Sequence, residues 1–443
     1  MRTSFTLAQL ADPDIADSEK ILRACVHCGF CTATCPTYVL DGNELDSPRG
    51  RIYLIKEMLE QNRPATPEVV LHIDRCLSCL ACMTTCPSGV NYMHLVDHAR
   101  VHIEHTYRRP FAERALRTML AKLLPYPRRF RLALIAALAG KPFAPLAEAL
   151  DFKRVAAMLG LAPRNWPQHP LAPQTFPALG SQRQGRVILL AGCVNDVLAP
   201  QINAATIRVL TRHGIEVVIA EGAGCCGSLV HHMGRDDEAL AQARANIDAW
   251  SAVQRADAIL INTSGCGTTV KDYGFMLRTD RAYAERAARI SSLAKDISEY
   301  LAGIPLKADP QPPGLVVAYH SACSLQHGQH ITRQPKDLLG KVGFQVKDVP
   351  EGHLCCGSAG TYNILQPDIA RRLRERKVGT IEKLRPDVIA AGNLGCITQL
   401  AAGTELPVVH TIELVDWATG GPCPQRLRDP RPLVAMPASA ATS

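Results

Sequence analysis

This sequence has few aromatic residues, no long apolar run and no apolar leader at its N-terminus. Phe, Trp and Tyr together make up 5% of its 443 residues. The best candidate for a membrane span, residues 132–140, is flanked by Arg and Lys and falls well short of the roughly 18 apolar residues that a spanning helix needs. Residues 1–20 hold no continuous apolar core before a small-residue cleavage site, so we expect no secretory signal and a cytoplasmic location.

The length and composition indicate an ordinary globular protein of two or three domains. The chain is 47% hydrophobic and 20% charged, and it contains 17 cysteines. Because the cytoplasm keeps thiols reduced, a disulfide framework is disfavoured and metal binding becomes the leading interpretation of these cysteines.

The first cysteine repeat is the motif C-x2-C-x2-C-x3-C-P, which occurs twice with a spacing of 51 residues. Three cysteines in such a tight loop can surround one face of a 4Fe-4S cube, whereas the fourth points away and ligates a second cluster. The ligand sets we expect are Cys25, Cys28, Cys31 and Cys86 for one 4Fe-4S cluster, and Cys35, Cys76, Cys79 and Cys82 for the other. Two structural zinc sites are the alternative, but zinc would leave the Cys-Pro elements unexplained. The apolar periodicity of residues 52–59 between the motifs predicts a helix, which favours a helical two-cluster ferredoxin domain.

A second repeat shows that the C-terminal half is an internal duplication. Its first copy contains Cys193, Cys225, Cys226 and Cys266, which recur 130 residues later as Cys323, Cys355, Cys356 and Cys396. In each copy short apolar runs alternate with helical stretches, which predicts two parallel α/β domains. Each cysteine then falls at or just beyond the carboxyl end of a strand, where open α/β sheets bind their ligands.

Several interpretations of the cysteines in these Cys-Cys-Gly domains remain. The cysteines can be inert core residues, although an adjacent Cys-Cys-Gly at a glycine-rich turn is poor core material. A zinc ion, a less fully ligated cluster and an empty thiol-rich docking site are the other candidates. The fold class that follows is an α-helical N-terminal domain joined to two α/β domains.

The expected organisation has five parts. They are a two-cluster ferredoxin domain at 1–100, a basic helical and Pro-rich connecting region at 101–182, Cys-Cys-Gly domains at 183–310 and 311–420, and a tail at 421–443. Residues 100–186 hold 15 Lys and Arg against 4 Asp and Glu. Such a segment lies on an anionic membrane, docks an acidic partner or forms a solvated face. His231 and His232 show no metal-binding spacing and are expected to contact solvent or a partner, and Cys423 is expected to be a spare thiol.

The motifs and the stretches around them resemble a known family of Cys-Cys-Gly proteins. Those stretches are LRACVHCGFCTATCPTY (22–38), SPRGRIYLIKEMLE (47–60), DRCLSCLACMTTCPSGV (74–90), NTSGCGTTVKDYG (262–274) and HLCCGSAGTYNILQPDIAR (353–371). The family includes heterodisulfide reductase subunits, the small subunit of anaerobic glycerol-3-phosphate dehydrogenase, and iron-sulfur subunits of lactate and glycolate oxidation; this sequence looks most similar to those of glycolate oxidase, also called glycolate dehydrogenase. Many members end each Cys-Cys-Gly domain in Cys-x-x-Cys, whereas each copy here supplies one cysteine there.

The resemblance implies an iron-sulfur subunit that is not active alone. A partner subunit would hold FAD and oxidise glycolate to glyoxylate, and the electrons would leave through the two 4Fe-4S clusters to a quinone-type acceptor, with the chain in the cytoplasm or peripheral on the inner membrane. The chain itself shows no G-x-G-x-x-G after an expected strand, which agrees with a flavin held elsewhere. The same role in a D-lactate or anaerobic glycerol-3-phosphate dehydrogenase is one alternative, and a zinc-binding assembly protein without redox activity is another.

Overall fold

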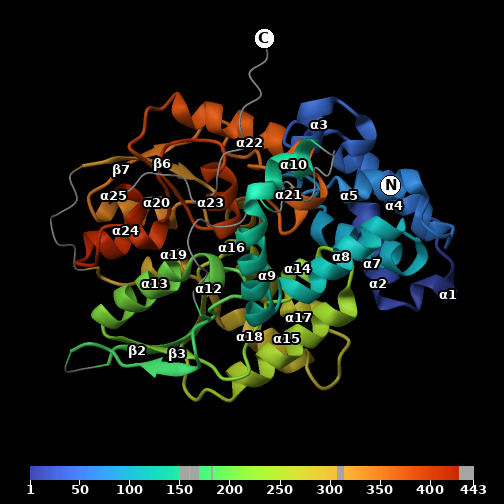
Figure 1. Ribbon diagram of the computed structural model, residues 1–443. Coiled ribbons are helices and arrows are strands. Elements are labelled where there is room, and N and C mark those ends of the chain that lie inside the picture. Colours follow the sequence, from blue (N-terminus) through green and yellow to red (C-terminus); the bar gives the residue numbers. More distant parts are fainter. Residues whose placement is uncertain (150–158, 160–168, 181–182, 307–313, 429–443) are drawn as a thin grey trace, which may run out of the picture.

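The computed structural model describes residues 1–149, 159, 169–180, 183–306 and 314–428. Figure 1 shows an N-terminal helical part on one side of the molecule and two α/β parts beside it. The predicted boundary at 310–311 lies outside the described residues.

The N-terminal part is helical, as predicted. Its helices are α1 (Leu7–Leu10), α2 (Pro13–Ala24), α3 (Pro36–Asp41), α4 (Pro48–Glu60), α5 (Pro67–Asp74), α6 (Ala81–Thr85) and α7 (Tyr92–Thr106), with 3₁₀ turns at Phe30–Thr32 and Glu44–Asp46. Helices α2, α4 and α5 share one start signal, a proline at the first helical position after a capping Asp12, Ser47 or Thr66. Helix α4 confirms the helix predicted at 52–59, and its apolar face packs into the core of this part.

The first α/β part is built on a sheet with strand order β1-β3-β2-β4-β5. The strands are β1 (Gln174–Phe176), β2 (Gly185–Leu189), β3 (Ile215–Ile219), β4 (Ala258–Ile261) and β5 (Ala294–Asp296). All pairings are parallel except that of β1, which runs antiparallel to β3 at the edge. The helices are α12 (Asn195–Leu198), α13 (Pro200–Arg212), α14 (Ser228–His231), α15 (Asp236–Ser251), α16 (Ser264–Lys271), α17 (Tyr273–Met276), α18 (Ala284–Leu293) and α19 (Ile297–Leu301).

The second α/β part repeats this design with the strand order β7-β6-β8-β9, all parallel. The strands are β6 (Val316–His320), β7 (Gln345–Asp348), β8 (Val388–Ala391) and β9 (Val408–His410). The helices are α20 (Gln334–Lys341), α21 (Tyr362–Leu365), α22 (Pro367–Glu382), α23 (Leu394–Ala401), α24 (Thr411–Ala418) and α25 (Gln425–Arg428). The register also repeats, because Val187 pairs with Ala258 in the first sheet and Val317 pairs with Val388 in the second. The duplication inferred from sequence is therefore present in the pairing of the strands.

Three short strands fall outside the sequence prediction. Strand β1 lies within the Pro-rich segment expected to be a linker, of which residues 163–168 lie outside the described part. Strands β5 and β9 have three residues each, and β5 reads Ala-Lys-Asp, too short to show apolar alternation. Each of the last two is held by parallel pairing to the preceding strand of its sheet.

The basic connecting region forms α8 (Phe111–Leu123), α9 (Pro127–Gly140) and α10 (Ala144–Ala149). Part of its positive charge is used inside the protein, because Arg109 and Arg117 both bind the Asp74 carboxylate at the end of α5. In Figure 1, α8 and α9 run between the helical part and the α/β parts. No helix among the described residues has the length and apolar character needed to cross a membrane.

The three parts dock through polar contacts. Arg208 and Arg212 of α13 both bind Asp416 of α24, which joins the two α/β parts. His94 of α7 binds Asp272 at 2.9 Å and stacks on Phe275, which joins the helical part to the first α/β part. The second α/β part is joined in turn by the Tyr362 hydroxyl, which donates to the carbonyl of Arg75.

Candidate metal centres

The two ferredoxin-type loops have the same backbone shape. In the first, His27 and Gly29 on either side of Cys28 have positive φ angles, and in the second Ser78 and Leu80 on either side of Cys79 do the same. Such left-handed residues are uncommon when they are not glycine, and they turn the chain tightly around the cysteine between them. The equivalence in sequence therefore extends to two matching, tightly wound loops.

The first predicted ligand set lines one cavity near the surface of the helical part. Cys25, Cys28 and Cys31 of the first motif meet Cys86 of the second there, and Cys82 also borders the cavity. Cys28 is exposed, whereas Cys25 is buried. Thiols from two separate motifs thus line one cavity, which contains the four of the expected set and Cys82 of the other set.

The second predicted set lies deeper. Burial raises the pKa of the Cys79 thiol well above its usual value, and Cys323, Cys35 and Cys76 raise it further. Burial likewise raises the pKa of Cys82, with Cys79, Cys76 and Cys35 as neighbours. Buried thiolates that lie close together repel one another, and bound iron relieves this repulsion. The donor chemistry of these residues therefore fits an iron-sulfur cluster.

Cationic and neutral donors surround this deeper set. Arg51 is fully buried, and its guanidinium lies 3.8 Å from the Cys35 sulfur. The Tyr92 hydroxyl donates to the Cys76 sulfur at 3.7 Å. Arg51 is held by the carboxylate of Asp46 at 3.4 Å and donates to the carbonyl of His72 at 2.7 Å. Sequence analysis did not single out Arg51, since it lies on a helix whose other buried positions are mainly apolar.

The cysteines of the first Cys-Cys-Gly domain converge at the carboxyl edge of its sheet. Cys193 follows β2, and its thiol lies 3.4 Å from that of Cys225 in the loop after β3. Cys226 contacts Cys225 on one side and Cys266 of α16 on the other. The hydrogen bond from Cys193 lowers the pKa of Cys225. Four thiols predicted to approach one another from three segments are therefore in contact.

The second Cys-Cys-Gly domain forms the same chain of thiol contacts. Cys355 contacts Cys323 after β6, and Cys356 contacts Cys396 of α23. Gly357 must be glycine because its φ is +92° and a Cβ there would lie 2.4 Å from the Ala370 carbonyl.

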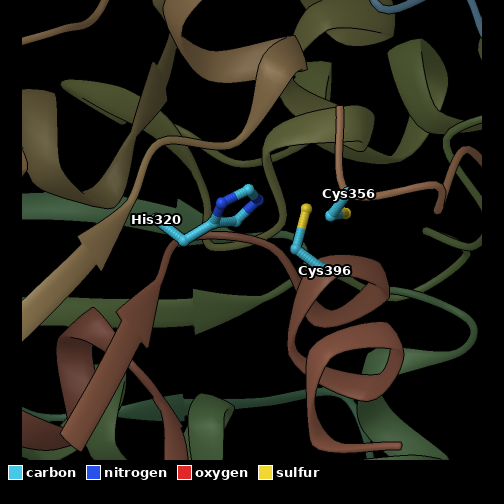
Figure 2. Close-up of side chains that lie close together, drawn as sticks. All are labelled: His320, Cys356 and Cys396. Atoms are coloured by element: carbon cyan, nitrogen blue, oxygen red, sulfur yellow. The ribbon is translucent and has the colours of Figure 1, made fainter. Parts of the chain in front are cut away.

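His320 adds a nitrogen donor to this second group. It ends strand β6, and its ring lies within 4.8 Å of the Cys356 and Cys396 sulfurs (Figure 2). Burial, and then Lys377, lower the pKa of His320 to about 3, so the ring is neutral. The sequence alone does not point to His320. It is one of 15 histidines, and no second histidine stands near it at a metal-binding spacing. A comparison of the two copies would have found it, since position 190 in the first copy is Leu.

One cavity of about 470 Å³ joins these centres. Its cysteines are Cys79 of the ferredoxin-type part, Cys193, Cys225, Cys226 and Cys266 of the first Cys-Cys-Gly domain, and Cys323, Cys355 and Cys396 of the second. The opposite wall is apolar and comes from α8 and α9, including Leu123, Phe130 and Leu134. The basic connecting helices therefore turn apolar side chains toward the cysteines.

Three further residues from the sequence analysis, one cysteine and two histidines, lie outside the thiol groups. Cys423 follows the second sheet and donates to the carbonyl of Pro424, outside the thiol groups. His231 contacts Asp97 of α7 at 3.3 Å, and His232 faces the same carboxylate at 3.9 Å. This pair, expected to face solvent or a partner, contacts the helical part of the same chain.

Comparison with known proteins agrees with this arrangement. The 4Fe-4S dicluster domain family matches residues 24–90, and the cysteine-rich domain family matches residues 187–271 and 317–401. A solved structure described as a hypothetical protein from Helicobacter pylori has a TM-score of 0.55 at 10% identity, covering 96% of this chain and 76% of that one, which is a likeness of fold alone.

Two curated relatives match nearly end to end. The glycolate oxidase iron-sulfur subunit of Escherichia coli K12 is 44% identical over 94% of this chain and 99% of its own length. The probable glycolate oxidase iron-sulfur subunit of Bacillus subtilis 168 is 31% identical over 91% of this chain and 95% of its own length. These matches confirm the resemblance found in the sequence, and the chain belongs to the family of glycolate oxidase iron-sulfur subunits.

Proposed function

We propose that this chain is the electron-transfer subunit of a multi-subunit, flavin-dependent glycolate dehydrogenase. A partner subunit holds FAD and oxidises glycolate to glyoxylate, and this chain conducts the electrons to a quinone-type acceptor. The observation that carries the proposal is the meeting of thiols from two motifs in the helical part. Family membership supports the choice of glycolate.

Eight cysteines would hold the two clusters. Cys25, Cys28, Cys31 and Cys86 are the proposed ligands of the outer one, and Cys35, Cys76, Cys79 and Cys82 are those of the inner one. Bound in these sites, 4Fe-4S clusters supply single-electron steps between a two-electron flavin and the acceptor.

The exposure of the outer site supports a contact with the flavin subunit. Cys28 is exposed, and its neighbours Val26 and Phe30 are 66% and 64% exposed. Exposed apolar side chains beside a cysteine at the surface are typical of a surface that a partner covers. We assign this loop to the contact with the flavin subunit.

The surroundings of the inner site support a role beside the acceptor. Cys79 packs with Leu77, Cys323 and Cys355 in one cluster of buried and partly buried side chains. The cavity beyond it combines the thiols with the apolar wall of α8 and α9, and an apolar pocket with a few polar groups suits a quinone ring. The thiols of both Cys-Cys-Gly domains would bind a further metal or cluster between the inner site and this cavity.

The same helices support peripheral attachment to the cytoplasmic face of the membrane. Leu132 of α9 is exposed, as are Phe143 and Leu146 beyond it. They stand in a segment rich in Arg and Lys, the combination that binds an anionic lipid surface. A lipid-soluble acceptor would then enter where α8 and α9 line the cavity.

Anaerobic metal analysis with low-temperature EPR tests the proposal. Two 4Fe-4S clusters predict about eight iron atoms per chain, matching acid-labile sulfide and cubane signals. Replacing Cys35 by Ser is expected to abolish dye-linked glycolate oxidation by the assembled complex while FAD stays on the partner, with Cys423→Ser as the matched control. Colourless, iron-free protein that still supports turnover would refute it.

The substrate requires a separate test, because a lactate utilization protein A is 26% identical over 52% of this chain. Deletion of the gene is expected to abolish growth on glycolate and to spare growth on D-lactate and glycerol. A defect confined to D-lactate would reassign the substrate and leave the electron-transfer role intact.

A further inference from the structure

The two Cys-Cys-Gly domains differ at one wall of their thiol groups. His320 and Lys377 of the second domain correspond, 130 residues earlier, to Leu190 and Ile247 of the first. Leu190 and Ile247 pack with Cys226 in the apolar core of the first domain. The duplicated fold therefore accepts apolar residues at both places, and packing alone does not explain an imidazole and an ammonium in the second copy.

The imidazole of His320 is buried without a polar partner. The residue has no exposed surface, and neither ring nitrogen has a hydrogen-bond partner within the described part of the chain. Burying a polar group without a hydrogen-bond partner is destabilising, and leucine in the sister position avoids that cost. A bound ion would satisfy the ring nitrogen.

The surroundings of the ring identify what it binds. Figure 2 shows His320 at the end of β6, close to two cysteines. Cys356 stands on a loop, and Cys396 stands on helix α23. The three donor atoms lie within 4.8 Å of one another. An imidazole nitrogen with two thiols is a donor set for metals of borderline softness, above all zinc and iron.

A positive charge lies beside the thiols of this domain. The Lys377 ammonium lies within electrostatic range of Cys323, Cys355 and Cys356, so that it offsets thiolate charge. It donates a hydrogen bond to the carbonyl of Glu351, which holds it in place. Ile247 provides no such charge in the first domain.

We infer that the second Cys-Cys-Gly domain holds a zinc or iron centre in which His320 is a nitrogen ligand beside Cys356 and Cys396. Cys355, which contacts Cys356, lies beside these three donors. The first domain, with Leu190 in place of the histidine, can offer sulfur ligands alone. The inference rests on the further metal that the proposed function includes at these thiols, it names a nitrogen ligand of that metal, and it does not depend on which substrate the complex oxidises.

Metal analysis of anaerobically purified full-length chain tests this. Wild-type protein is expected to carry zinc, or iron beyond the eight or so atoms of the two 4Fe-4S clusters. His320→Leu, which copies the first domain, and Cys396→Ser are each expected to lose about one metal centre per chain while the cubane EPR signals stay unchanged. Cys423→Ser, a thiol variant outside the site, is expected to retain it.

Spectroscopy of the wild-type protein supplies a readout that does not depend on whether a variant folds. For zinc, X-ray absorption should show nitrogen together with sulfur in the first coordination shell. For iron, pulsed EPR of protein labelled with ¹⁵N-histidine should show a nitrogen coupling that the cubanes alone do not give. No metal beyond the cubane iron, a centre with sulfur ligands alone, or full metal content in His320→Leu would each overturn the inference. Loss of the cubanes themselves would instead count against the proposed function.

Discussion

Arg51 offers the sharpest test of how the fold tunes the inner cluster. Its guanidinium is fully buried and lies 3.8 Å from the Cys35 sulfur, a proposed ligand. At an effective dielectric constant of about 20, a unit charge at this distance interacts with roughly 4 kcal/mol, and spreading the negative charge over the cluster reduces this to roughly 3 kcal/mol. Since 1.36 kcal/mol corresponds to about 59 mV for one electron, Arg51→Gln should lower the potential of the inner cluster by roughly 130 mV.

The assay is a redox titration of the anaerobic protein followed by EPR. Arg49→Gln is the matched control, because Arg49 lies beside the outer cavity with a third of its side chain exposed, where solvent screens its charge. Arg51→Lys keeps the charge but not the guanidinium contacts to Asp46, Thr37 and His72, so it should shift the potential less than Arg51→Gln. An unchanged inner potential in Arg51→Gln, with both clusters present, would show that the Arg51 charge does not set this potential.

Three further outcomes follow from the contacts described. Burial lowers the pKa of His231, but the nearby Asp97 and Asp236 carboxylates raise it to about 10, so its stabilising contribution is complete below about pH 6.5 and is lost as the pH rises toward 10. Thermal unfolding should show this fall, and His231→Gln should flatten it. Gly357→Ala should destabilise the second Cys-Cys-Gly domain by about 1–3 kcal/mol or more, because the new Cβ would lie 2.4 Å from the Ala370 carbonyl oxygen. Gly227→Ala should destabilise the first domain by less, because its Cβ would lie 3.1 Å from the Ala239 carbonyl oxygen. Equal denaturation midpoints for the two variants would contradict this. Replacing Val26 and Phe30 by Ser should weaken binding of the flavin subunit about tenfold or more in a titration, whereas Leu179→Ser, also exposed but in the connecting region, should not.

The parts of the molecule that sequence analysis predicted are those whose signals are local. Cysteine spacing and the alternation of apolar runs each lie within one stretch of chain, and the 130-residue repeat appears when two such stretches are compared. Together they predicted the helical part and the two parallel α/β parts. The apolar wall of the cavity could not be predicted, because it depends on how α8 and α9 pack against thiols far along the chain. Arg51 was missed for a related reason, since its partner Asp46 and its neighbour Cys35 meet it only in the folded loops.

The two duplicated domains have equivalent cysteines but different residues behind them. Both copies supply four thiols from three segments, and both place them at the carboxyl edge of a parallel sheet. They differ in the residues behind the thiols, which are Leu190 and Ile247 in the first copy and His320 and Lys377 in the second. Because both groups open on the same cavity, the second can differ from the first in donor atoms and charge, while the first offers sulfur donors alone. Duplication thus provides two unlike donor sets beside one cavity, and the side chains that make them unlike are those in which the repeat is broken.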